Sequence, residues 1–275
     1  MKGITQEEWA PYHKQVLHSL SSLAQSISGI PTHPAGNEYT SLMSCFLMHN
    51  VSGARSLLAL YDSAGADWFP VTVGYTIARS IFEVDVTAHY ITLLPQERSS
   101  QYILFEHVLN KQAMDICNKY RKSDDPSWHA TMEIEWHEKW ANKEHEINSK
   151  FSEVRPKFTS TDRKGKERLF QNWSGKSIRD LAVEVRHEEA YDTFYSDLSS
   201  FTHGDVRLAN RFLWIQPDRL QWTQRANPYD VGKVFHDASS FLTCYLKLFG
   251  SQFHVWNSDA VEACWNTNKT NSWAH

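Results

Sequence analysis

The sequence predicts an all-α fold, a helical bundle with a charged helical insertion in the middle of the chain. Apolar residues recur every three or four positions over long runs, which is the spacing of an amphipathic helix. Glycine and proline interrupt these runs at intervals that suit helices of ordinary length. Only residues 211–216 resemble a strand, and a lone strand has nothing to pair with, so we do not expect a sheet there.

The length allows one large domain or two small ones, and we expect a single all-helical globular domain over residues 1–275. Of the 275 residues, 41% are hydrophobic and 13% are aromatic, which is enough to build a substantial core. The formal net charge of −4 provides no global basic field, so any binding of nucleic acid would need a local patch.

Several absences point to a cytoplasmic protein. The four cysteines are scattered and lack C-x-x-C spacing, which argues against a disulfide framework and against a zinc knuckle. The first residues lack the apolar segment of a signal peptide, and the chain has no uninterrupted apolar run of about 18 residues. We therefore expect no membrane partner.

The first half of the chain predicts four helices. Thr5 and Glu8 have the spacing of a capping box, and the apolar pattern after them continues to Gly29. Residues 39–61 predict a second helix, broken or bent near Gly53. The central helix covers residues 76–94, with Pro70 suited to its first turn and Pro95 ending it. A further helix follows from Gln96.

The second half begins with the charged insertion at residues 119–168. It includes a polar helix at 128–151, held by Trp128, Trp136 and Trp140, and a flexible loop at 159–166. Three further helices are predicted: a short helix at 180–187, a helix at 188–202 closed by His203 and Gly204, and a long helix at 229–249. The tail at 251–275 is predicted to be partly mobile, with Trp256, Trp265 and Trp273 packing back onto the bundle.

The central helix carries four ionisable residues among apolar ones. Arg79 and Glu83 share one face, and Asp85 and His89 form a second polar pair on another. Buried charges are rare unless they are paired or used in function. Arg79 and Glu83 are either a structural ion pair or a site in which the guanidinium binds phosphate or carboxylate and Glu83 orients it or acts as a base.

A second set of polar residues lies on the helix predicted at 188–202. Tyr195 and Ser199 share a side of this helix, and His203 follows at its last turn. His203 either caps the helix terminus or acts as a titratable group beside the central helix. Because a charged pair on a buried helix needs polar neighbours, we predict that Arg79 and Glu83 lie within side-chain reach of this later helix.

No sequence pattern indicates a metal or a cofactor. His129, Glu133, His137 and His145 share one side of the charged helix, but neither His-Glu-x-x-His nor paired Glu-x-x-His motifs occur. A helix face that is exposed to solvent explains this row of histidine and glutamate residues. Phosphate-binding Gly-rich loops and G-x-S-x-G elbows are also absent from the sequence. We therefore expect neither metal nor cofactor.

Three stretches resemble a known bacterial family. They are ARSIFEVDVTAHY at 78–90, NWSGKSIRDLAVEV at 172–185 and YDTFYSDLSSFTHGD at 191–205. Together they resemble domain-of-unknown-function family 5677 over roughly residues 41–249. The resemblance implies an all-helical fold and a polar cluster drawn from Arg79, Glu83, Tyr195, Ser199 and His203, but it implies no reaction.

A looser similarity connects the chain with the HEPN class of helical ribonucleases, which are common in bacterial toxin and phage-defence systems. That class uses an arginine and a histidine four to six residues apart on one helix. This sequence departs from the pattern, because Arg179 and His187 are too far apart and His203 and Arg207 occur in the reverse order.

Two functional hypotheses follow. The first is a nuclease-like defence or toxin effector that acts on RNA or a nucleotide through Arg79, Glu83 and His203, with Asp85, His89, Tyr195 and Ser199 binding the ligand. The second is a non-catalytic ligand-binding or regulatory bundle in which the same cluster is structural. The expected partner is an anionic small molecule or RNA, and a homo-oligomer is left open.

Overall fold

A computed structural model of the protein describes residues 6–123, 125–195, 198–199, 213–216, 219–222 and 225–271. Helices dominate these residues, so the all-α prediction is confirmed. Contacts gather in two compact units, Met1–Pro95 with Ile178–His275 and, separately, Gln96–Ser177. The single-domain assignment stays a prediction.

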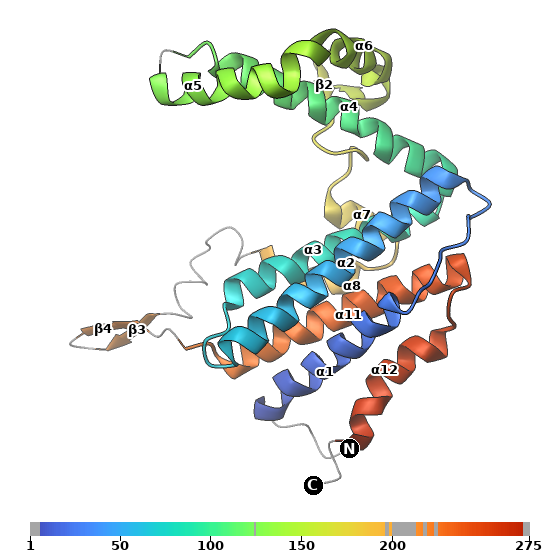
Figure 1. The fold of residues 1–275 in the computed structure, drawn as a ribbon, viewed down its shortest axis with the longest axis vertical. Coiled ribbons are helices and arrows are strands. Elements are labelled where there is room, and N and C mark those ends of the chain that lie inside the picture. The colour runs from blue at the N-terminus through green and yellow to red at the C-terminus, as the bar shows by residue number, and fades with distance from the viewer. Residues whose placement is uncertain are drawn as a thin grey trace. The chain divides into compact units, whose positions relative to one another are not determined.

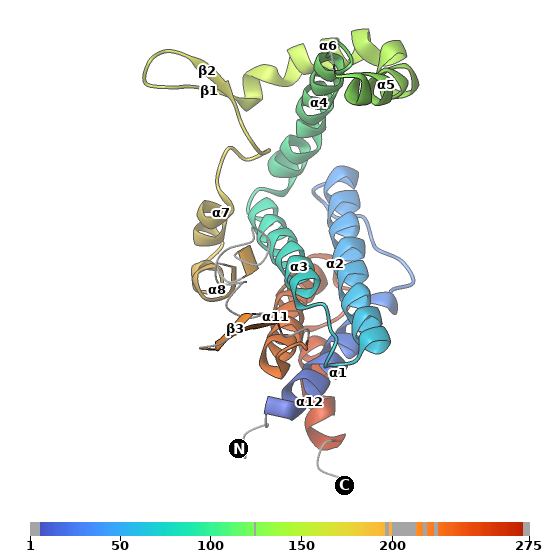
Figure 2. The same ribbon diagram turned by 90° about the vertical axis from the view of Figure 1, so that its left-hand side faces the viewer.

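Four long helices form the bundle of the first unit (Figures 1 and 2). They are α1 (Gln6–Gln25), α2 (Asn37–Ala64), α3 (Val71–Thr92) and α11 (Pro228–Phe253). Helix α1 packs on α2, α2 on α3, α3 on α11, and α11 on α1, which closes a ring around one hydrophobic core. The last helix, α12 (Ser258–Asn271), packs on α1 and α11.

The central helix α3 is among the most buried elements, as predicted. Ile81 and Ile91 are completely buried, and Ile77 and Val84 are half-buried. Its apolar side chains face both α2 and α11, so little of its surface is left for a broad polar face.

The predicted break in the second helix is wrong. Helix α2 runs without interruption from Asn37 to Ala64. A Cβ atom added at Gly53 would lie 3.3 Å from Ile77 Cγ2 and 3.3 Å from Ile81 Cδ1. Gly53 therefore allows α2 and α3 to approach closely and does not interrupt the helix.

The C-terminal segment contains a helix, α12, that the sequence did not predict. Trp256 Nε1 donates a hydrogen bond to the Leu246 carbonyl oxygen at 2.9 Å, and Trp265 Nε1 donates one to Thr243 Oγ1 at 2.8 Å. These two tryptophans pack back onto α11 as expected, and Trp273 lies outside the described residues. Their indole N–H groups fix the segment because a buried N–H needs a partner.

Gly250 is a position at which α11 has no room for a side chain. A Cβ atom there would lie 2.5 Å from Trp256 Nε1 and 2.9 Å from the Trp256 carbonyl oxygen. We expect Gly250→Ala to displace the indole, break its hydrogen bond and lower the free energy of unfolding by about 1–2 kcal/mol despite the better helix propensity of alanine. Urea unfolding measures the change. A matched Trp256→Ala background should remove most of the penalty, and a Gly250→Ala variant more stable than the parent would contradict the prediction.

The second unit holds the charged segment. Its helices are α4 (Pro95–Tyr120), α5 (Pro126–Glu135) and α6 (Glu144–Val154). The continuous helix predicted at 128–151 is wrong, because a π-helix, η1 (Trp136–Trp140), and a 3-10 turn, η2 (Ala141–Lys143), separate α5 from α6.

A small core explains this interruption. Trp136 is buried with Met114 and Cys117, and Trp140 is partly buried against them. Trp128, by contrast, is 54% exposed, so it does not hold the segment as predicted. The π-turn provides the change of helical phase that the two central tryptophans need to face one core.

Two antiparallel hairpins correct the predictions for the loops. The expected flexible loop at 159–166 begins as strand β1 (Thr159–Thr161), after the 3-10 turn η3 (Arg155–Phe158), and β1 pairs with β2 (Glu167–Leu169), which directly follows the loop. Strand β3 (Leu213–Gln216) pairs with β4 (Arg219–Trp222). The argument that a lone strand has no partner failed because the partner strand, β4, begins only three positions after the last residue of β3.

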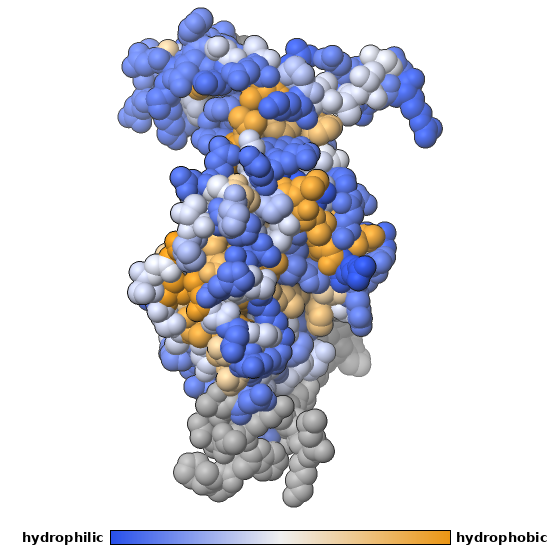
Figure 3. Space-filling model, turned by 90° about the vertical axis from the view of Figure 1, so that its right-hand side faces the viewer, coloured by the Kyte–Doolittle hydropathy of each residue, from blue (hydrophilic) through white to orange (hydrophobic). Residues whose placement is uncertain are grey.

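The surface of the charged segment is solvated. His129, His137 and His145 are exposed, Glu133 is half-buried, and His137 Nε2 lies 3.1 Å from Glu133 Oε1. On the face in Figure 3, hydrophobic side chains form separate patches among hydrophilic ones. Within the described residues, every helix is too short or too polar to traverse a bilayer.

Candidate functional site

A tight turn after α7 (Ile178–Glu184) positions His187. The His187 N–H bonds to the Ala182 carbonyl at 2.7 Å, and the Arg186 N–H bonds to the Val183 carbonyl at 3.2 Å. Arg186 is left-handed, with φ of 61°, so the two bonds form a Schellman motif. Since α7 packs on α3, this turn brings His187 to the central helix.

The next segment is less regular than predicted. In place of one α-helix at 188–202, a single turn, α8 (Glu188–Ala190), leads into a π-helix, η4 (Tyr191–Tyr195). Ser199 lies in a helical turn and is half-buried, whereas His203 lies outside the described residues. π-Turns shift side chains around a helix axis and are frequent at functional sites.

Arg79, Glu83 and Tyr195 form the first polar cluster. Arg79 Nε donates a hydrogen bond to Glu83 Oε1 at 2.8 Å, and the Tyr195 hydroxyl donates one to the same oxygen at 2.7 Å. The Arg79 guanidinium carbon lies 5.0 Å from the centre of the Tyr195 ring. The predicted proximity of Arg79 and Glu83 to the later segment is therefore confirmed.

This first cluster is only partly shielded from water. The Arg79 side chain is 20% exposed and that of Glu83 is 39% exposed, so the expectation of a buried Glu83 is wrong. Tyr195 itself is buried, and burial followed by its hydrogen bond to Glu83 raises the pKa of its hydroxyl well above the usual value. Tyr195 is therefore a hydrogen-bond donor at every physiological pH.

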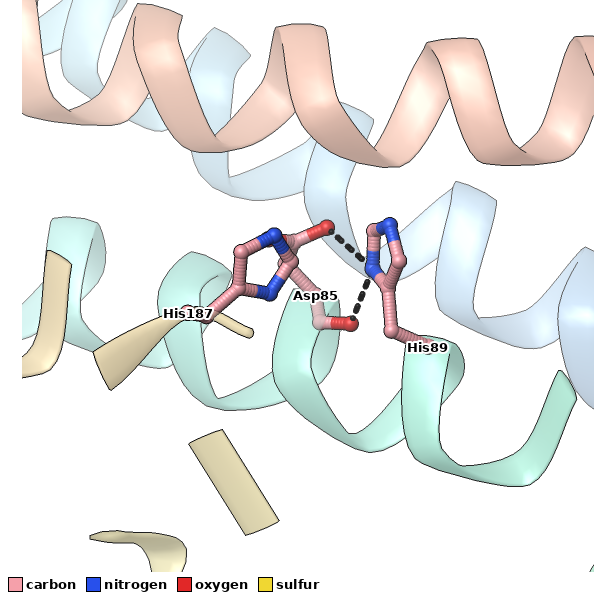
Figure 4. Close-up of side chains that lie close together, drawn as sticks. All are labelled: Asp85, His89 and His187. Atoms are coloured by element: carbon pink, nitrogen blue, oxygen red, sulfur yellow. Dashed lines mark hydrogen bonds and ion pairs between the residues drawn. The ribbon is translucent and has the colours of Figure 1, made fainter. Parts of the chain in front are cut away.

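Asp85, His89 and His187 form the second polar cluster (Figure 4). Asp85 is almost completely buried, and its Oδ1 lies 3.1 Å from His89 Nδ1. The same ring nitrogen lies 3.0 Å from the Asp85 carbonyl oxygen. The His89 and His187 rings meet edge to face, with centres 4.6 Å apart.

The two imidazoles of the second cluster have different surroundings. Burial disfavours the charged form of His89, but the negative charge of Asp85 and the interactions of its carboxylate and backbone carbonyl with the ring together outweigh burial and raise the pKa of this histidine. Burial lowers the pKa of His187, and Asp85 only partly compensates. One segment covers both clusters, since His187 meets Asp85 and His89, and Tyr195 meets Glu83 and Arg79.

Sequence reasoning missed His187 as a partner of Asp85 and His89. Nothing in its local sequence marks it, because only the packing of α7 on α3 brings it there. It also missed a buried ion pair on α11, where Lys233 Nζ lies 2.9 Å from Asp237 Oδ2. Opposite charges four residues apart on an apolar helix were the available signal, the same one that marked Arg79 and Glu83.

Comparisons with known proteins identify a family. No similar protein was found among curated proteins or solved structures. The model of a family described only as of unknown function matches residues 41–219. This range includes α3 and the segment 187–195, and therefore both polar clusters. The chain belongs to the family of unknown function DUF5677.

Proposed function

We propose that this protein acts on a phosphate-bearing substrate, such as RNA or a nucleotide, that binds at Arg79. The observation that carries the proposal is how the Arg79 guanidinium is held and how accessible the Arg79 side chain is to solvent. Glu83 and the Tyr195 ring hold it in one orientation, while a fifth of the side chain stays accessible to solvent. A planar, oriented guanidinium on a side chain that is partly accessible to solvent suits the oxygen atoms of a phosphate.

Each residue of the site would have a separate role. Arg79 binds the phosphate, Glu83 orients the guanidinium, and Tyr195 fixes Glu83 through its hydrogen bond. His203 serves as the general acid or base, a role that rests on its sequence position after Tyr195 and Ser199. Cleavage of cellular RNA by this arrangement would suit a defence or toxin effector.

The same contacts support a second candidate, a non-catalytic bundle that binds an anionic ligand or uses the cluster only to organise its core. Tyr195 is buried and bonded to Glu83, which is how structural polar networks are satisfied. Binding without turnover would distinguish this candidate from the enzyme.

Arg79→Ala tests the binding site. We expect at least a tenfold loss of affinity for a fluorescently labelled single-stranded RNA or for ATP, measured by anisotropy or calorimetry, because a charge-assisted contact disappears. The free energy of unfolding should fall by less than about 1 kcal/mol, since the pair with Glu83 is partly exposed. A large loss of stability with unchanged affinity would show that the pair is structural.

Arg55→Ala is the matched control. Arg55 lies in Ala54-Arg55-Ser56 on α2, which repeats Ala78-Arg79-Ser80 on α3, and it is exposed. It lines a different site, a hollow of about 800 Å³ between the end of α1 and α2. Loss of affinity in Arg55→Ala alone would move the binding site to that hollow and refute the one at Arg79.

Turnover is tested separately with His203→Ala. If the protein is an enzyme, wild type should cleave the RNA or hydrolyse the nucleotide, and this variant should lose activity while keeping its affinity. Tight binding by wild type with no detectable product would favour the non-catalytic bundle.

A further inference from the structure

Asp85, His89 and His187 bring three potential metal ligands to one place. Asp85 and His89 are one turn apart on α3, and His187 arrives from the turn after α7. One ligand atom from each residue can be chosen so that all three lie within 4.8 Å of one another. Figure 4 shows the His187 ring beside the Asp85 side chain, with His89 across from it.

Two atoms of this cluster are buried without a hydrogen bond. Among the described residues, Asp85 Oδ1 and His187 Nδ1 have no hydrogen-bond partner. The 3.1 Å approach of His89 Nδ1 to Asp85 Oδ1 is an ion-pair distance, but its direction is not that of a hydrogen bond. Buried polar atoms without partners are costly and rare, so each requires an explanation.

A cation accounts for both atoms together. A carboxylate oxygen and an unprotonated imidazole nitrogen can each donate a lone pair to the same ion, so one cation provides a partner for both buried atoms. The carboxylate is close to both rings, because Asp85 Oδ1 lies 3.1 Å from His89 Nδ1 and one ligand atom of each of the three residues lies within 4.8 Å of the others.

The ligand set selects the class of metal. Two imidazoles with one carboxylate suit zinc and related first-row ions, whereas magnesium and calcium prefer oxygen ligands alone. Bonds of about 2.0–2.2 Å place tetrahedral ligand atoms roughly 3.4 Å apart. The ligand atoms lie within 4.8 Å of one another, so binding of an ion would require them to move closer together.

We propose that Asp85, His89 and His187 bind one divalent first-row transition metal ion of the zinc class. Three protein ligands leave a coordination position for water or a substrate atom. The bond between His89 Nδ1 and the Asp85 carbonyl resembles the second-shell contact of many metal-binding histidines, which hold the ring while the other nitrogen binds the ion. This proposal is independent of phosphate binding at Arg79, so either can fail alone.

The test uses the full chain without a histidine tag. After treatment with a chelator, the protein is equilibrated with Zn²⁺ and the bound metal is measured by mass spectrometry, with affinity obtained by competition against a chromophoric zinc chelator. We expect one zinc ion per chain. Co²⁺ in place of Zn²⁺ should produce the visible bands of a four- or five-coordinate site with nitrogen ligands.

His187→Ala should lower the zinc affinity at least about 100-fold, because it removes a direct ligand. Asp85→Asn should weaken binding as well, but this residue is buried, so circular dichroism must show that the variant is folded. Where Asp85→Asn does not fold, His89→Ala replaces it, since the His89 side chain is 22% exposed. Added Zn²⁺ should raise the melting temperature of wild type and not that of His187→Ala.

The matched control is His137→Ala. His137 and Glu133 form another histidine–carboxylate pair four residues apart, but the His137 side chain is 69% exposed. Its replacement should leave zinc affinity unchanged. The proposal is overturned if wild type binds no stoichiometric metal, if His187→Ala binds as tightly as wild type, or if His137→Ala loses the ion.

Discussion

Lys233→Met is expected to lower the free energy of unfolding by about 3–5 kcal/mol, because it leaves a charged carboxylate in the core without its ammonium partner. The Asp237 side chain is completely buried, and that of Lys233 is only 9% exposed. The substitution removes Lys233 Nζ from Asp237 Oδ2, while Asp237 Oδ1 stays 3.1 Å from His236 Nδ1. Urea unfolding followed by circular dichroism measures the change.

The double variant Lys233→Met/Asp237→Leu tests whether the unpaired charge of Asp237 causes the loss of stability. Replacing both members with apolar residues should recover most of the lost stability, since no buried charge is then left alone. Lys14→Met is the matched control in the same unit, where Lys14 pairs with the exposed Asp62, and it should cost less than about 1 kcal/mol. A double variant as unstable as Lys233→Met would show that packing, and not the unpaired charge, causes the loss.

His13 should make the protein lose stability as the pH falls below 6.5. Its side chain is buried among the rings of Trp9, Tyr12, His236 and Trp265. Burial, and then the neighbouring His236, lower the pKa of His13 from 6.5 to about 3. The unfolded chain therefore takes up a proton below pH 6.5 that the folded chain does not.

The direction of the pH dependence follows from this difference in proton uptake between the folded and the unfolded chain. The stability that neutral His13 provides is complete above pH 6.5 and is lost progressively as the pH falls toward 3. At about 1.4 kcal/mol per pH unit, the loss reaches about 3 kcal/mol at pH 4. The measurement is the free energy of unfolding against pH for wild type and for His13→Phe, whose ring suits the same aromatic site. Parallel curves for the two proteins would contradict the prediction.

Local pattern predicted most of the helices but not their irregularities. The spacing of apolar residues and the positions of Pro70 and Pro95 located α3 to within a few residues of its ends, except that it begins at Val71. The π-helices η1 and η4 were not predicted, because each arises where buried rings must meet a core that the local sequence does not describe. Gly53 was misread for the same reason, since its role is the contact with α3.

The candidate site likewise contains features that the local sequence predicted and features that it did not. The pairs Arg79 with Glu83 and Asp85 with His89 were predictable because residues four apart on a helix are neighbours whatever surrounds them. The proximity of Tyr195 was inferred from the need of a charged pair for polar neighbours, and the structure confirms it. The burial of Glu83 was inferred in the same way and is wrong, because its side chain is 39% exposed.

The sequence by itself determined an all-α chain with long amphipathic helices and two polar pairs on the central one, since these features depend on spacing along a single helix. Only the tertiary structure decided that His187 joins Asp85 and His89, and that α11 buries Lys233 with Asp237. Apolar helix faces are chemically alike, so a sequence pattern does not specify which of them pack together. Shape complementarity between whole helices makes that choice, and the composition of the polar clusters follows from it.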